Sequence, residues 1–189
     1  MVEKNTLRRV YLDKRLVLST EEYEERNRRL VDLLLANINF HDFHCVHLFL
    51  PILEKKEVNT WLVLEALRKM NPSMCFLTSK TLENGQLAHY EICVETRFKE
   101  NKWGVPEPVE GKAADINSID LIIIPLITYD KKGQRIGYGK GYYDRFLKKT
   151  PQAFKLGVSL GPPLDHIQYN NSYDVKLDAC ASPFVYYKF

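Results

Sequence analysis

The stretch Leu121-Ile122-Ile123-Ile124-Pro125-Leu126 is the most hydrophobic segment of this 189-residue chain. Its residues are apolar at consecutive rather than alternate positions, and three of them are β-branched isoleucines, a pattern typical of a strand covered on both faces. The run is far shorter than the roughly 18 to 20 apolar residues that cross a bilayer. We therefore predict that it forms the central strand of a sheet with helices on both sides.

The segments around this strand alternate between short apolar runs and helical patterns. The apolar runs predict further strands at 45–51, 75–78, 87–94, 154–158 and 183–187. Helical patterns predict two helices within residues 1–40, and one each at 61–70 and 142–149. This alternation predicts an α/β sandwich with a largely parallel sheet that becomes mixed at an edge.

Two local expectations depend on single residue types. Ser19 followed by Glu22 is a capping box, so the second helix is expected to begin there and run to about Asn37. The prolines within 103–108 predict a loop with no strand. The first helix is expected to bury its apolar side chains, which are Leu7, Val10, Tyr11, Leu16 and Leu18.

Composition limits the classes of protein to which the chain can belong. With 45% hydrophobic and 27% charged residues it is typical of a folded protein, and its length predicts one domain over residues 1–189. Its net charge, 27 Lys+Arg minus 24 Asp+Glu, is +3, and the signs are interleaved. We expect no nucleic-acid partner and no membrane partner.

The cysteines bear on the cellular compartment. They form no C-x-x-C pair and no zinc-finger spacing, so we expect buried, reduced thiols at Cys45, Cys75, Cys93 and Cys180. No apolar targeting segment follows the N-terminus. Both observations favour a cytoplasmic location.

The richest candidate site is the segment Arg135-Ile136-Gly137-Tyr138-Gly139-Lys140-Gly141-Tyr142-Tyr143-Asp144-Arg145. Alternate glycines let backbone N–H groups approach a phosphate, and the helix that follows directs its positive dipole end to the same place. Lysine and arginine add charge, and the aspartate is a hard ligand suited to Mg²⁺. A glycine triplet alone is equally compatible with a flexible turn. Neither a Walker A motif nor a Rossmann fingerprint is present.

Four further residues are candidates that each have an ordinary structural explanation. Lys4 and Arg8 lie one helical turn apart and suit a polyphosphate, or simply face solvent. Glu57 follows the first strand, where a substrate-orienting carboxylate or an exposed loop acid would lie. Trp103 is suited to the wall of an aromatic pocket or to anchoring its loop.

Taken together, these residues resemble the 5-formyltetrahydrofolate cyclo-ligase family, also called 5,10-methenyltetrahydrofolate synthetases. The resemblance spans Lys4 to about Asp178 and rests on Lys4-x-x-Leu7-Arg8, Glu57-Val58-Asn59-Thr60, the Trp103–Pro108 segment and residues 130–145. It implies a three-layer Rossmann-like fold and a monomer in the cytoplasm or an organelle matrix. It also implies conversion of 5-formyltetrahydrofolate to 5,10-methenyltetrahydrofolate, driven by Mg²⁺ and ATP with release of ADP and phosphate.

The resemblance also implies roles for individual residues. ATP would be bound by Lys4, Arg8, Arg135, Ile136, Gly137, Tyr138, Gly139, Lys140, Gly141, Tyr142 and Tyr143. The folate would be bound by Leu50, Glu57, Trp103, Tyr138 and Tyr142. Catalysis would fall to Lys140, Tyr142 and Arg145. Mg²⁺ would be held by Asp144 and Asp174, with Asp178 as a competitor for the second position.

One departure from the family and two rival functions remain open. Tyr138 stands where some members carry arginine, which removes one phosphate contact. A phosphosugar isomerase or an acyl-CoA-type transferase on a similar sheet would use the glycine loop without ATP hydrolysis. A non-catalytic nucleotide- or RNA-binding module would use the same loop for stacking and backbone contacts.

Overall fold

The computed structural model describes residues 4–83, 85–168 and 173–189. Four α-helices occur in this part of the chain: α1 (Lys4–Leu16), α2 (Thr20–Asn37), α3 (Thr60–Met70) and α4 (Tyr142–Lys149). Its strands are β1 (Cys45–Leu48), β2 (Cys75–Thr81), β3 (Leu87–Glu91), β4 (Phe98–Glu100), β5 (Pro106–Pro108), β6 (Leu121–Pro125), β7 (Thr128–Tyr129), β8 (Arg135–Ile136), β9 (Phe154–Val158), β10 (Ala179–Ala181) and β11 (Tyr186–Lys188).

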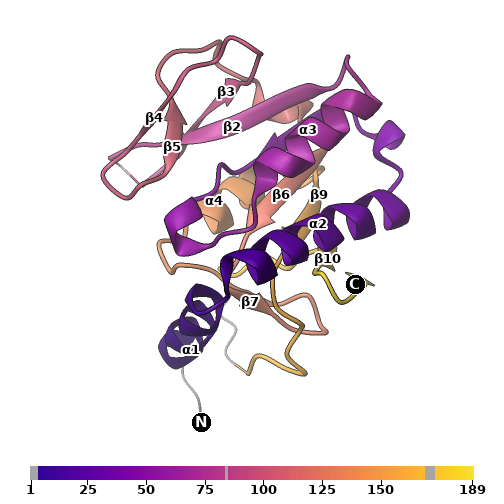
Figure 1. Ribbon diagram of the computed structural model, residues 1–189. Coiled ribbons are helices and arrows are strands. Elements are labelled where there is room, and N and C mark those ends of the chain that lie inside the picture. The colour runs from indigo at the N-terminus through magenta and orange to yellow at the C-terminus, as the bar shows by residue number, and fades with distance from the viewer. Residues whose placement is uncertain (1–3, 84, 169–172) are drawn as a thin grey trace.

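The main sheet has seven strands in the order β11-β10-β9-β6-β1-β2-β3, so β6 lies at its centre (Figure 1). The five strands from β10 to β2 run parallel to one another. The edge strands β3 and β11 each pair antiparallel with their neighbour. The predicted α/β sandwich, with a largely parallel sheet that is mixed at its edges, is confirmed.

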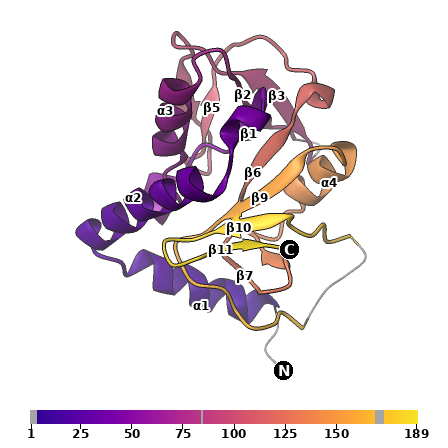
Figure 2. The same cartoon turned by 90° about the vertical axis from the view of Figure 1, so that its right-hand side faces the viewer.

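Helices cover both faces of this sheet, with α2 and α3 on one face and α4 on the other (Figure 2). Alternate residues of β6 contact the two helical layers. Leu121 and Ile123 belong to the core on the side of α2 and α3, and Ile122 and Ile124 to the core on the side of α4. All four are fully buried, which explains why β6 is apolar at consecutive positions.

Helix α1 differs from its prediction. Val10 and Leu16 are 37% and 39% exposed, and Arg15 is the one buried residue among the described residues of this helix. The prediction was therefore wrong for Val10 and Leu16, whereas Leu18, just beyond the helix, is buried as predicted. The physical reason is that α1 packs beside the short β7–β8 hairpin, away from the central sheet, and contacts the loop after β8 through Arg8 and Arg15. The predicted capping of α2 is confirmed, since the Ser19 hydroxyl accepts a hydrogen bond from the Glu22 backbone N–H.

Three other local expectations need correction. Pro106–Pro108 forms strand β5, which pairs with β4 in a separate two-stranded sheet, a setting that tolerates proline because an edge strand needs few N–H donors. Strand β10 was not predicted, because three small residues carry little pattern. Cys93 is exposed and Cys75 is half-buried, while Cys45 and Cys180 are buried as expected.

No helix in the described ranges is long and apolar enough to cross a membrane.

Candidate functional site

A cavity of about 310 Å³ opens at the carboxyl ends of β1 and β6. This is the edge of a parallel sheet at which ligands usually bind. Phe49 and Leu50 line it just after β1, and Pro125 lines it from the end of β6. The segment that follows β9 was a third candidate, and it contributes Asp174 and Val175 to the lining.

The glycine loop forms one wall of this cavity. Gly139 and Gly141 have φ angles of +87° and +69°, in the left-handed region that disfavours other residues. A Cβ atom at Gly139 would lie 3.0 Å from the Arg8 guanidinium carbon, and one at Gly141 would lie 2.8 Å from an Arg145 nitrogen. Gly141 is also the N-cap of α4, so the loop leads directly to the positive end of the helix dipole.

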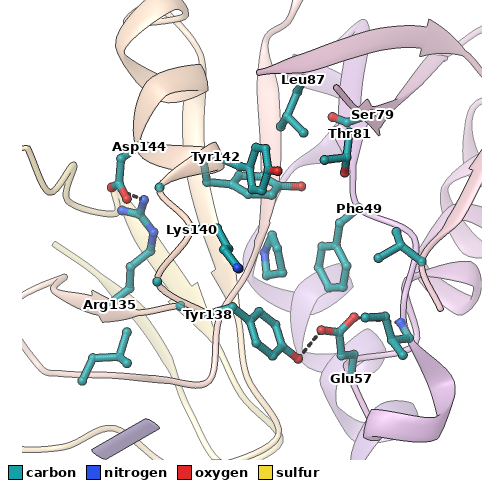
Figure 3. Close-up of a pocket in the computed structure, with 18 of the residues that line it drawn as sticks. Phe49, Glu57, Ser79, Thr81, Leu87, Arg135, Tyr138, Lys140, Tyr142 and Asp144 are labelled. Atoms are coloured by element: carbon teal, nitrogen blue, oxygen red, sulfur yellow. Dashed lines mark hydrogen bonds and ion pairs between the residues drawn. The ribbon is translucent and has the colours of Figure 1, made fainter. Parts of the chain in front are cut away.

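Cations surround this wall. Arg8 donates from Nε to the Gly137 carbonyl over 2.8 Å, and Lys4 Nζ lies 2.5 Å from the Asp174 carboxylate. The Lys140 side chain points from the loop toward the middle of the cavity, between Tyr138 and Tyr142 (Figure 3). This end of the cavity therefore combines loop N–H groups with the positive charges of three side chains, an arrangement suited to phosphates.

Two carboxylates lie at the same end. Asp144, in the first turn of α4, accepts a hydrogen bond from Arg135 over 2.6 Å and another from the Val175 backbone N–H over 3.3 Å. Arg135 also donates to the Val175 carbonyl, which ties the glycine loop to the C-terminal segment. Asp174 is the second cavity-lining carboxylate. Asp178 instead accepts a hydrogen bond from the Lys155 backbone N–H and is absent from the described lining.

These carboxylates fit a Mg²⁺ ion that shares its coordination with phosphates. Within the described ranges, no three His, Cys, Asp or Glu side chains converge as a self-sufficient metal site. Mg²⁺ in nucleotide sites usually needs only one or two protein carboxylates, because water and phosphate oxygens supply the other ligands. Asp144 and Asp174 match that requirement.

The opposite end of the cavity contains a buried carboxylate. Glu57 is 5% exposed and accepts a hydrogen bond from the Ile52 backbone N–H over 2.8 Å. Tyr138 donates its hydroxyl to the other Glu57 oxygen (Figure 3), and Arg15 donates to that hydroxyl over 2.5 Å. Burial, reinforced by the neighbouring Glu57 charge, raises the pKa of Tyr138, so its proton stays in place as a donor.

Flat and apolar side chains form the remaining walls. They are Phe49, Leu50, Leu87, Trp103, Val105 and Tyr142. Trp103 is 44% exposed, so its ring stands at the mouth of the cavity rather than inside a core. Such walls suit a planar ring system, and Glu57 beside them suits ring N–H donors.

Strand β2 adds a polar group that the sequence did not indicate. Ser79 lines the cavity, and its hydroxyl lies 2.7 Å from His47 Nε2 and 3.3 Å from His89 Nδ1. Burial, with a contribution from His89, holds the pKa of His47 well below its usual value. Burial and nearby Lys149 lower the pKa of His89 to about 4. Both imidazoles are therefore neutral at pH 7.

The structure brings most of the sequence-predicted residues together. Those that line the cavity are Lys4, Arg8, Leu50, Glu57, Trp103, Arg135, Ile136, Gly137, Tyr138, Gly139, Lys140, Gly141, Tyr142, Tyr143, Asp144 and Asp174. Arg145 lies behind the loop, where it donates to the carbonyls of Gly85 and Lys140. Arg15, Phe49 and Ser79 were missed, and of these only Phe49 carried a signal, because it directly precedes the predicted Leu50.

Comparisons with known proteins agree with this geometry. The sequence model of the 5-formyltetrahydrofolate cyclo-ligase family matches residues 1–159. The chain is 27% identical to the 5-formyltetrahydrofolate cyclo-ligase of Mus musculus, over 90% of this chain and 89% of the relative. It is 29% identical to a probable 5-formyltetrahydrofolate cyclo-ligase of Schizosaccharomyces pombe, over 74% of each chain.

Solved structures give the same result. The 5,10-methenyltetrahydrofolate synthetase of Aquifex aeolicus superposes with a TM-score of 0.82 at 27% identity, covering 98% of this chain and 92% of that one. A 5,10-methenyltetrahydrofolate synthetase of Mycoplasma pneumoniae superposes with a TM-score of 0.74 at 27% identity, covering 96% of this chain and 99% of that one.

Proposed function

Because this chain belongs to the 5-formyltetrahydrofolate cyclo-ligase family, we propose that it uses ATP and Mg²⁺ to convert 5-formyltetrahydrofolate to 5,10-methenyltetrahydrofolate. ADP and phosphate are the other products. The observation that carries this proposal is that one cavity has two chemically distinct ends: a cationic glycine loop with two carboxylates, and a flat apolar wall with buried Glu57. The family match leaves the phosphosugar isomerase, acyl-CoA transferase and RNA-binding alternatives without support.

The cationic end is proposed to bind the nucleotide. Lys4 and Arg8 neutralise the phosphates from α1, while the Arg135–Tyr143 loop wraps them with backbone N–H groups. Lys140 points into the cavity, which supports a role for it at the terminal phosphate. Asp144 and Asp174 would hold Mg²⁺, which would neutralise charge on the phosphate oxygens when it is bound.

The apolar end is proposed to bind the folate. Glu57 accepts hydrogen bonds from N–H groups of the pterin, while Leu50 and Trp103 cover its faces. Tyr138 and Tyr142 flank Lys140, between the two ends of the cavity. The formyl group and the γ-phosphate would meet at this point.

The proposed reaction has two steps. The formyl oxygen of the substrate bonds to the γ-phosphorus, and the bond to the leaving ADP oxygen breaks, which leaves an imidate phosphate. The neighbouring folate amine then bonds to the activated formyl carbon and loses its proton, and the carbon–oxygen bond breaks to release phosphate. Neither step needs a protein nucleophile, so the protein contributes positioning and charge stabilisation.

The proposed catalytic residues contribute in different ways. Lys140 stabilises the charge that develops on the transferred phosphoryl group, and Tyr142 orients the formyl group beside it. Arg145 lies behind the loop and holds the Lys140 carbonyl over 3.1 Å, so its contribution is to the position of the loop. We further propose that the active form is a monomer.

The test is to follow the near-ultraviolet absorbance of the methenyl product from 5-formyltetrahydrofolate, with and without Mg-ATP. Absorbance should grow only when Mg-ATP is present. Lys140→Ala should raise the KM for ATP about ten- to a hundredfold, the usual cost of one charged phosphate contact. Lys132→Ala removes an exposed lysine outside the cavity and should change nothing. A folded protein that forms no product, or an unchanged KM in Lys140→Ala, would contradict the proposal.

A further inference from the structure

Arg15 is an unusual residue to bury. It is 9% exposed, and its Nε atom is buried without a hydrogen-bond partner among the residues that the structure describes. A guanidinium with an unpartnered nitrogen is costly to bury, and an apolar side chain of similar size would stabilise the fold as well or better. Packing therefore gives no reason for an arginine at this position, and a functional reason is needed.

The helix geometry shows which surface Arg15 serves. At about 100° per residue, Lys4, Arg8 and Arg15 lie within about 40° of one another around the axis of α1. The structure pairs each of them with a residue that lines the same cavity: Asp174 for Lys4, Gly137 for Arg8 and Tyr138 for Arg15. One face of α1 therefore runs along the cavity. Arg15 lies at the end of the cavity that is proposed to bind the folate.

Arg15 itself is not among the described lining residues, so its effect passes through Tyr138. Arg15 donates to the Tyr138 hydroxyl over 2.5 Å, and that hydroxyl donates to a Glu57 carboxylate oxygen. Two cations lie near the Tyr138 ring, since the Arg15 guanidinium and the Lys55 ammonium are each 5.8 Å from its centroid. Such a chain of hydrogen bonds strengthens each member, because a polarised hydroxyl is a better donor to the carboxylate.

The chain leaves Glu57 able to bind a ligand. One carboxylate oxygen accepts from Tyr138 and the other from the Ile52 backbone N–H, which fixes the plane of the carboxylate. A carboxylate offers about four acceptor positions, so two further N–H donors can be accommodated. The hydrogen bonds from Tyr138 and Ile52 determine the directions from which these two donors can approach.

We propose that Arg15 is a positioning residue for folate recognition, which acts through Tyr138 to hold Glu57 in the orientation that accepts the pterin N–H groups. This inference rests on the proposed function. Loss of Arg15 weakens folate binding, because the Tyr138 hydroxyl then loses its donor and no longer holds Glu57 in one rotamer. ATP binding is largely spared, since Lys4, Arg8 and the glycine loop keep their contacts.

The experiment measures equilibrium binding of 5-formyltetrahydrofolate and the KM values for both substrates. Arg15→Met should weaken folate binding about tenfold, in line with the loss of one charged hydrogen bond, and change the KM for ATP less than about threefold. Arg9→Met is the matched control, because Arg9 is an exposed arginine on the same helix. It should bind folate as the unmodified protein does.

A double-mutant cycle with Tyr138→Phe tests whether Arg15 acts through Tyr138. Tyr138→Phe alone should weaken folate binding, and adding Arg15→Met should then cause little further loss. Equal effects of Arg15→Met in both backgrounds would overturn the proposal. Tighter folate binding in Tyr138→Phe would also overturn it, because the tyrosine would then be competing with the folate for Glu57.

Two further measurements distinguish a specific loss of folate binding from a loss of folding, and failure of this inference from failure of the proposed function. Thermal unfolding of each variant is measured, and if Arg15→Met does not fold, Arg15→Lys and Tyr138→Phe carry the test. Arg15→Lys should recover part of the folate affinity, because it keeps a donor for Tyr138. An unmodified protein that binds no folate would overturn the proposed function and this inference together. Normal folate binding by folded Arg15→Met would overturn the inference alone.

Discussion

Lys4 and Asp174 are 170 positions apart in the sequence, yet the Lys4 ammonium lies 2.5 Å from the Asp174 carboxylate. Their side chains are 22% and 23% exposed, and a partly solvated ion pair of this kind contributes only about 0 to 1 kcal/mol to stability. The pair brings α1 and the C-terminal segment together at the cationic end of the cavity. Because the pair is weak, the proposed binding of Mg-ATP to both partners would open it at little cost.

The first prediction concerns the metal. Asp144→Asn and Asp174→Asn should each raise the Mg²⁺ concentration needed for half-maximal turnover about tenfold, because each removes a charged oxygen ligand. Asp178→Asn is the matched control, since Asp178 bonds to Lys155 and lies outside the described lining of the cavity. A Mg²⁺ titration at saturating ATP measures this. An effect of Asp178→Asn in place of Asp174→Asn would reverse their assignment.

The second prediction concerns the folate carboxylate. Glu57→Gln should weaken 5-formyltetrahydrofolate binding about tenfold or more while leaving the KM for ATP within about threefold, because a neutral amide presents one acceptor oxygen instead of two. Glu54→Gln, at an exposed acid three residues away, should have no effect. Steady-state kinetics with each substrate varied in turn checks this. Equal losses toward both substrates would argue against a specific folate role.

The third prediction separates two glycines of one loop. Gly139→Ala places a methyl group 3.0 Å from the Arg8 guanidinium at a φ of +87°, so it should destabilise the loop by about 1 kcal/mol or more even without ligand. Gly137→Ala meets nothing within 4 Å and should leave stability unchanged while weakening ATP binding. Urea unfolding and ATP titration of both variants, with Gly161→Ala as control, measure the difference. If Gly137→Ala binds ATP as tightly as the unmodified protein, the ATP phosphates do not approach the backbone at Gly137.

The fourth prediction concerns pH and stability. The pKa of folded His89 is about 4, below its unfolded value of about 6.5, so the unfolded chain binds more protons within this window. Stability should therefore fall as pH decreases from about 6.5 toward 4, by up to about 1.4 kcal/mol per pH unit for this histidine. His47, whose pKa is also lowered by burial, adds to the same trend. Urea unfolding at several pH values measures this, and the free energy of unfolding of His89→Gln should depend less steeply on pH. An unchanged pH dependence in this variant would contradict the prediction.

Local pattern was enough to predict much of the fold. Leu121–Pro125 was placed at the centre of the sheet because a strand with helices on both faces must be apolar at consecutive positions. The bounds of α4 followed from a glycine before it and a proline after it. The start of α2 followed from its capping serine. In each case the residues that determine the element lie within it or next to it in the sequence.

The local pattern failed where distant segments decide the outcome. Val10 and Leu16 of α1 are exposed although we predicted them to be buried, because the partner of this helix is a hairpin more than a hundred residues away. Strand β10 went unpredicted because its three small residues become a strand only between β9 and β11. Prolines in β5 are tolerated only because the strand lies in a small separate sheet.

The same division holds for the site. The sequence by itself determined which chemistry the chain can perform, because glycine spacing, cations and acids within 135–145 are properties of residue types. Only the tertiary structure decided which residues act together. It brought Arg15 within hydrogen-bond distance of Tyr138, and Tyr138 within hydrogen-bond distance of Glu57. It also paired the Lys4 ammonium with the Asp174 carboxylate. Hydrogen bonds and ion pairs depend on distances of a few ångströms, and the packing of the whole chain sets those distances.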